Sequence, residues 1–100
     1  MSSQAKLRTC YRSVRNIEMY NILECIEEKF KADLDASKRT SSSYDEFSTE
    51  TYNDYLIASA KIATLHLVEL LDEEEYLDIK NYFESIRFDL LSEEKAEEEE

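Results

Sequence analysis

The single histidine, His66, is the first residue to consider for chemistry, because imidazole can act as acid, base or metal ligand near neutral pH. Glu69 follows three residues later and completes one H-x-x-E pair. A carboxylate-bridged two-metal site in a helical protein needs a second pair of this kind, which the chain lacks. His66 also lies in the most apolar stretch of the chain. We therefore expect a structural histidine at a helix interface.

The two cysteines, Cys10 and Cys25, have a spacing that fits neither a redox pair nor a zinc site. If one helix holds both, their backbones are about 22 Å apart, which is too far for a disulfide. We interpret both as buried or half-buried apolar residues. The sequence has neither a secretory apolar segment nor an apolar run long enough for a membrane span, so we expect a reduced, cytoplasmic compartment.

The chain contains no glycine and no proline among its 100 residues. Glycine-rich loops that hold nucleotide phosphates are therefore excluded, and histidine-based triads lack a suitable partner arrangement. Carboxylates are numerous but follow no pattern that suggests a pocket. We expect a protein that is not an enzyme and that uses no cofactor and no metal.

The absence of glycine also predicts the fold class, because tight hairpin turns depend on residues with positive φ. We expect an all-α protein, a small antiparallel bundle of three helices. Four helices remain an alternative if the first one breaks near Arg15–Asn16. A single domain should cover residues 1–91, with helices at about 4–36, 44–71 and 73–91 and a disordered acidic tail at 92–100.

Local signals support these boundaries. Residues 38–43 (KRTSSS) predict a loop, since clustered hydroxyl groups compete for backbone hydrogen bonds. Ser43 with Glu46 and Asp72 with Glu75 each predict a capping box at the start of a helix. Residues 56–71 are apolar on nearly every side, which predicts that the second helix is the central one.

Charge is the main functional signal. The net charge is −12, and it is uneven: residues 1–40 hold eight bases and six acids, whereas residues 41–100 hold four bases and eighteen acids. Acids on a helix can imitate a nucleic-acid backbone and occupy a groove that binds nucleic acid. We therefore expect a regulator or inhibitor that docks an acidic helical face on a basic partner protein. The expected contact residues are Glu69, Asp72, Glu73, Glu74, Glu75, Asp78, Glu84 and Asp89.

Two other interpretations of the charge remain. The acids could have no function other than keeping the protein soluble. The basic start of the chain, with Lys6, Arg8, Arg12 and Arg15, could contact phosphates. Repulsion of a −12 chain from nucleic acid, and the lack of a known DNA-binding motif, argue against direct nucleic-acid binding.

Seven tyrosines are more than a bundle of this size is expected to bury. Tyrosine is common at interfaces because it combines a large contact area with a polar end. This pattern favours a second function, a self-associating structural or chaperone-like subunit that forms a homodimer. The expected interface residues are Tyr11, Tyr20, Tyr44, Tyr52 and Tyr55. Salt should weaken the acidic complex steeply and affect the self-association little.

Overall fold

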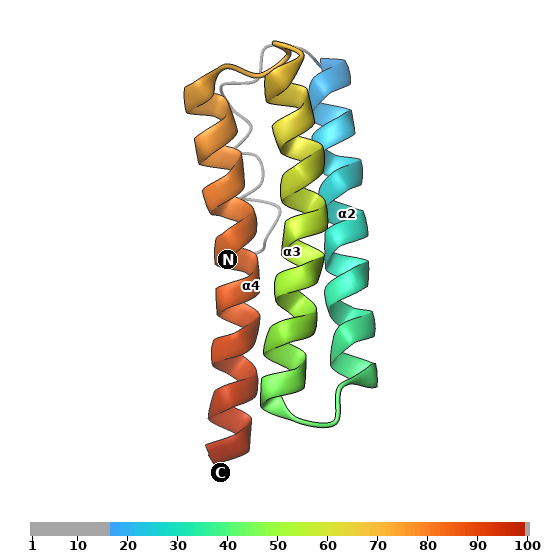
Figure 1. Cartoon of the computed structure of the whole chain (residues 1–100), viewed down its shortest axis with the longest axis vertical. Helices are drawn as coiled ribbons and strands as arrows, with labels where there is room; N and C mark the ends of the chain where they lie inside the picture. The colour runs from blue at the N-terminus through green and yellow to red at the C-terminus, as the bar shows by residue number, and fades with distance from the viewer. Residues whose placement is uncertain (1–16, 100) are drawn as a thin grey trace.

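The computed structural model describes residues 17–99, which form three α-helices and no β-strand (Figure 1). The helices are α2 (Ile17–Thr40), α3 (Tyr44–Leu67) and α4 (Glu73–Glu99). Figure 1 shows them side by side, with α3 running in the opposite direction to α2 and α4. The expected all-helical class is confirmed for this part of the chain. None of the three described helices is long and apolar enough to cross a membrane.

The first predicted helix differs from α2 at its C-terminal end. Its predicted start at residue 4 and the alternative break at Arg15–Asn16 lie outside the described residues. Its predicted end at residue 36 is wrong, because α2 continues to Thr40. The Thr40 hydroxyl donates to the Ala36 carbonyl oxygen over 3.1 Å, and basic side chains in the last turn suit the negative end of the helix dipole. The loop is therefore only residues 41–43.

The start of α3 was predicted correctly. Ser43 is the N-cap residue, and its side-chain oxygen accepts from the Glu46 backbone N–H over 3.2 Å. The Glu46 carboxylate accepts from the Ser42 hydroxyl over 2.8 Å, whereas a complete capping box would use the Ser43 backbone N–H.

The end of α3 was predicted four residues too late, since the helix stops at Leu67 rather than residue 71. Glu69 has a φ of 65°, in the left-handed region that glycine normally occupies after a helix. The Leu70 N–H donates to the Leu65 carbonyl, and the Glu69 N–H donates to the His66 carbonyl, both over 3.0 Å. This is a Schellman motif, and it closes the helix although the chain has no glycine to place there.

The start of α4 shows the complete capping box that was predicted. The Asp72 N–H donates to Glu75 Oε1 over 3.0 Å, and the Glu75 N–H donates to Asp72 Oδ1 over 2.7 Å. The predicted end at residue 91 is wrong, and the structure shows helix rather than a disordered tail through Glu99. Glutamate, lysine and alanine have high helix propensity, and Glu94 pairs with Lys38 of α2 over 2.8 Å.

The core lies between the three helices. The rings of Phe30 and Phe83 stack there with centroids 5.4 Å apart. Buried residues of the main cluster are Met19, Leu23, Phe30, Leu34, Tyr55, Ala58, Ile62, Leu71, Ile79, Tyr82 and Phe83. The predicted central position of α3 holds in that it packs against both α2 and α4. Its outer face, however, stays in contact with solvent, so its apolar residues are only partly used by the core.

Two charged side chains are buried among these apolar residues. Glu27 of α2 accepts a hydrogen bond from the Tyr82 hydroxyl over 2.6 Å. Arg87 of α4 donates to Thr51 Oγ1 over 3.2 Å and to the Ser48 carbonyl over 3.0 Å. Both groups link residues that are more than 30 positions apart in the sequence.

Candidate functional site

Most of the acids predicted to bind a partner lie at one end of the molecule, where α3 turns into α4. Glu69 is in the turn itself, Asp72 precedes α4, and the next three acids form its first turn. Asp78 follows one turn later and is exposed. The structure therefore brings six of the eight predicted residues to the α3–α4 end.

The other two predicted acids lie further along α4, on different sides of it. Glu84 is half-buried and accepts a hydrogen bond from the Tyr55 hydroxyl of α3 over 3.4 Å. Asp89 is exposed beside the groove between α2 and α4, and it lines that groove together with Lys31 and Lys38. The predicted acids therefore do not form one continuous face along α4.

Asp72, Glu75 and Glu84 have structural contacts of their own. Asp72 and Glu75 bind backbone N–H groups at the start of α4. Burial raises the pKa of Tyr55 above its ordinary value of 10.0, and the charge of Glu84 raises it further. Because these carboxylates stabilise the fold, the acids best placed for a partner are Glu69, Glu73 and Glu74, all exposed.

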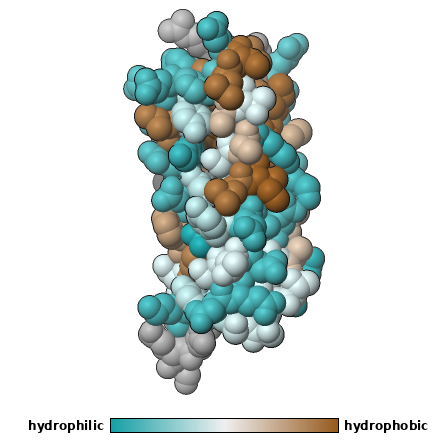
Figure 2. All heavy atoms as spheres, in the orientation of Figure 1, coloured by the Kyte–Doolittle hydropathy of each residue, from teal (hydrophilic) through white to brown (hydrophobic). Residues whose placement is uncertain are grey.

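The same end exposes apolar side chains that the sequence analysis assigned to the core. Leu67 is 79% exposed, and Val68 and Leu70 are more than half exposed. They follow the end of α3 at Leu67, where the chain turns through Glu69 in the left-handed region. Acidic residues lie next to them in the sequence. We call Leu67, Val68, Glu69, Leu70, Asp72, Glu73 and Glu74 the turn surface. Figure 2 shows apolar surface at this end of α3, next to hydrophilic surface.

The predicted tyrosine interface is not assembled into one surface. Tyr11 lies outside the described residues. Tyr20 and Tyr44 are half-buried, and Tyr55 is buried against Glu84. Tyr52 is 49% exposed and is the one tyrosine of this set, among the described residues, that presents a large part of its ring to solvent.

His66 occupies the kind of position that was expected. It is half-buried, and its ring stacks on Tyr76 of α4 with centroids 4.8 Å apart. Its Nδ1 lies 3.0 Å from the Leu71 carbonyl oxygen, which can only accept, so Nδ1 carries the proton. Within residues 17–99, no group of three or more His, Cys, Asp or Glu side chains could hold a metal.

The prediction for Cys25 is wrong, because its side chain is exposed. The core face of α2 carries Leu23, Glu27 and Phe30, and position 25 points away from it at about 100° per residue. The prediction for Cys10 lies outside the described residues.

Apart from Tyr52, which it assigned to an interface, the sequence analysis missed the outer face of α3. Tyr52, Leu56 and Ile57 are each about half exposed there, and Phe88 of α4 is 50% exposed beside the same groove as Tyr52 and Leu56. The signal was present in the apolar run 56–71, but it was read as evidence for complete burial.

Comparison with known proteins finds no match: no family model, no curated protein and no solved structure resembles this chain.

Proposed function

We propose that this protein is a non-enzymatic regulator or inhibitor that docks its turn surface on a basic partner protein. The observation that carries the proposal is the combination of exposed apolar and acidic side chains at that end. Leu67, Val68 and Leu70 project into solvent among Glu69, Glu73 and Glu74. Exposed apolar residues with a polar rim are typical of protein interaction sites.

The charge of the rim selects the partner. The acids of the turn surface repel acidic proteins and attract basic ones, and this attraction raises the association rate as well as the affinity. The leucines supply contact area that a purely electrostatic complex lacks. A nucleic-acid-binding protein is the partner class proposed here, because its binding groove is already complementary to negative charge.

The test is capture of partners from the native lysate with the tagged chain, after nuclease treatment and with washes of increasing salt. We expect a basic protein that salt releases and that added nucleic acid displaces. The double variant Glu73→Lys with Glu74→Lys should lose it, and Leu67→Ser should weaken its capture.

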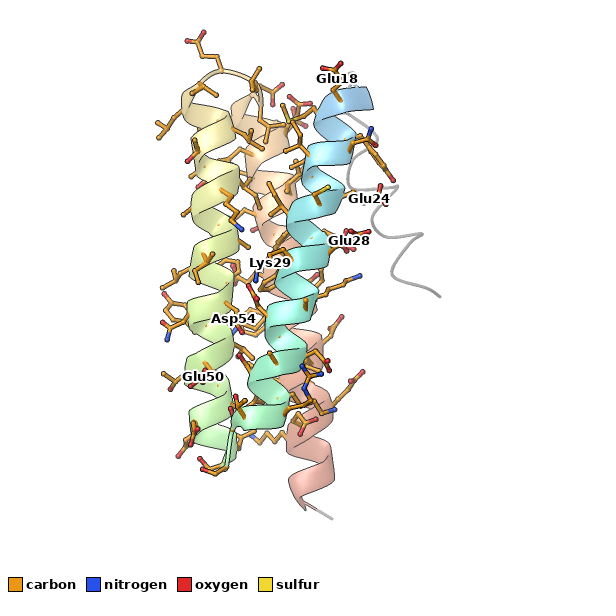
Figure 3. All side chains as sticks on the ribbon, turned by 90° about the vertical axis from the view of Figure 1, so that its right-hand side faces the viewer. Glu18, Glu24, Glu28, Lys29, Glu50 and Asp54 are labelled. Atoms are coloured by element: carbon orange, nitrogen blue, oxygen red, sulfur yellow. The ribbon has the colours of Figure 1, made fainter. Side chains whose placement is uncertain are left out.

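The matched control is Glu24→Lys with Glu28→Lys on α2, which makes the same change in net charge away from the turn surface (Figure 3). Capture that survives in the Glu73/Glu74 variant, or that is lost equally in the α2 control, would contradict the proposal. Thermal denaturation of both variants separates loss of binding from loss of folding, because reversed charges in the first turn of α4 also oppose the helix dipole.

A further inference from the structure

The pocket between α3 and α4 differs chemically from the turn surface. Its volume is about 340 Å³, near the lower end of the range for pockets that bind small molecules. Apolar side chains line it from both helices: Tyr52 and Leu56 of α3 are 49% and 45% exposed, and Phe88 of α4 is 50% exposed. Lys80 and Arg87 of α4 also line it. Apolar and aromatic walls with a few charged groups are typical of sites for small organic ligands.

Arg87 indicates the charge of the ligand. It is 9% exposed, yet no carboxylate oxygen of the described residues lies within 4.0 Å of its guanidinium group. Buried charges are usually paired with an opposite charge. Its Nε donates to Thr51 and its Nη2 to Ser48, whereas no described residue accepts a hydrogen bond from Nη1. The guanidinium therefore retains donors for a carboxylate, which accepts strong charge-assisted hydrogen bonds from such a group.

Lys80 adds a second positive charge on the same side of α4. Seven residues separate it from Arg87, which places the two about 20° apart around the helix and about 10 Å apart along it. Lys80 is half-buried, and its ammonium group lies 5.9 Å from the centre of the Tyr76 ring. No carboxylate of the described residues lies within 4.0 Å of that ammonium group. In a chain with 24 acids and 12 bases, two such cations at one pocket create a local attraction for an anion.

Glu84 limits the charge that the pocket can accept. It lies between Lys80 and Arg87 along α4, lines the same pocket, and accepts a hydrogen bond from the Tyr55 hydroxyl over 3.4 Å. Because Glu84 is half-buried, its charge is screened less than that of an exposed acid and repels a second negative charge nearby. A ligand with one negative charge therefore fits better than a doubly charged phosphate. The aromatic walls favour a ligand that carries a ring.

We propose that the pocket between α3 and α4 binds a small aromatic monocarboxylate. The carboxylate accepts hydrogen bonds from the guanidinium group of Arg87 and is attracted by the ammonium group of Lys80. The ring of the ligand lies against Tyr52, Leu56 and Phe88. No residue that lines this pocket belongs to the turn surface, so the proposal does not depend on the proposed function.

Titration of the isotope-labelled full chain with phenylacetate, followed by amide chemical shifts in NMR spectra, tests the pocket. We expect a dissociation constant of about 1 mM, because a ligand of this size makes few contacts. The shifted amides should belong to residues 52–59 and 80–88. Phenylacetamide, which has the same shape without the charge, should bind about tenfold more weakly. Phenyl phosphate should also bind more weakly than phenylacetate, and Glu84→Gln should reduce that difference.

Variants at the rim of the pocket test the roles of its residues. Lys80→Gln and Phe88→Ala should each raise the dissociation constant of phenylacetate about threefold, through lost attraction and lost ring contact. Arg87→Lys keeps the charge without the planar guanidinium and should raise it about tenfold. The matched control is Lys61→Gln, the same charge change at an exposed position on the side of α3 opposite Tyr52, and it should have no effect. Circular dichroism must show that each variant keeps its helices.

Four results would overturn the proposal. The first is an absence of shift changes at about 10 mM phenylacetate, and the second is a set of shifted amides that lies outside residues 52–59 and 80–88. The third is a dissociation constant that Lys80→Gln and Phe88→Ala leave unchanged. The fourth is binding of phenylacetamide or phenyl phosphate that is as tight as that of phenylacetate, because the ligand class would then be wrong.

Discussion

The contacts of α4 with α2 and with α3 each bury one charged side chain, but only the side chain on the α2 side has a buried polar atom without a hydrogen-bond partner among the described residues. Arg87 of α4 is 9% exposed and donates to Thr51 and Ser48 of α3, and its guanidinium lies 5.3 Å from the centre of the Tyr52 ring. Its donors bind hydroxyl and carbonyl oxygens, and its positive charge faces an aromatic ring.

Glu27, on the α2 side, is 2% exposed. Its Oε1 accepts from the Tyr82 hydroxyl and lies 3.0 Å from the Lys31 ammonium group, whereas its Oε2 is buried without a hydrogen-bond partner among the described residues. A groove of about 540 Å³ also opens on this side, between α2 and α4. The difference suggests that the α3–α4 contact depends on specific polar pairing, while the α2–α4 contact depends mainly on aromatic packing.

The largest expected effect is that of Arg87→Ala, which should lower the free energy of unfolding by about 3 kcal/mol. It removes one donor from the buried Thr51 hydroxyl and one from the Ser48 carbonyl, which keep the hydrogen bond between them over 3.1 Å, and it removes the packing against Tyr52. Urea denaturation measures the change. Arg87→Met keeps much of the packing and should lose less, so equal losses in the two variants would show that the polar contacts dominate. A loss below about 1 kcal/mol in Arg87→Ala would break the comparison.

A smaller effect is expected at Glu27. Glu27→Leu should cost about 1 to 2 kcal/mol, because the buried Tyr82 hydroxyl loses this acceptor. Adding Tyr82→Phe should recover most of that loss, since it removes the hydroxyl that lost its acceptor. A double-mutant cycle by urea denaturation measures the coupling. A double variant that is less stable than Glu27→Leu would show that this site is as specific as that of Arg87.

The smallest effect concerns pH and the second polar link between α3 and α4. Because the pKa of Tyr55 is raised in the folded protein, the unfolded chain loses this proton first as pH rises. The stabilisation is therefore complete below about pH 10 and is lost as pH rises through the folded pKa. Urea midpoints measured between neutral and strongly alkaline pH should fall less steeply in Tyr55→Phe, and also in Glu84→Gln. If the urea midpoint of Tyr55→Phe falls at alkaline pH as steeply as that of the wild type, Tyr55 does not contribute to this pH dependence.

Local sequence was sufficient wherever a few neighbouring residues decide the structure. The lack of glycine indicated helices, and the capping residues Ser43 and Asp72 marked the starts of α3 and α4 correctly. Helix ends were predicted less well. The Glu69 turn ends α3 without a glycine, and the favourable helix propensity of an acidic segment carries α4 past residue 91.

The candidate sites were only partly predictable for the same reason. The acids around Glu73 were identified because they are consecutive in the sequence. Their separation into capping residues and solvent-facing residues depends on where α3 stops. The exposed Leu67 and the outer face of α3 were missed, because the sequence alone does not indicate whether an apolar residue is buried in the core or exposed to solvent.

The sequence by itself determined that the chain is helical, acidic toward its C-terminal end and divided by two capped helix starts, since these follow from propensity, composition and contacts within one turn. Only the tertiary structure decided that Glu27 is the buried acid among the residues whose burial is described, that α3 holds Arg87, and that one apolar side of α3 remains in solvent. Those outcomes depend on which helix faces lie opposite one another, and contacts between residues far apart in the chain leave no local pattern.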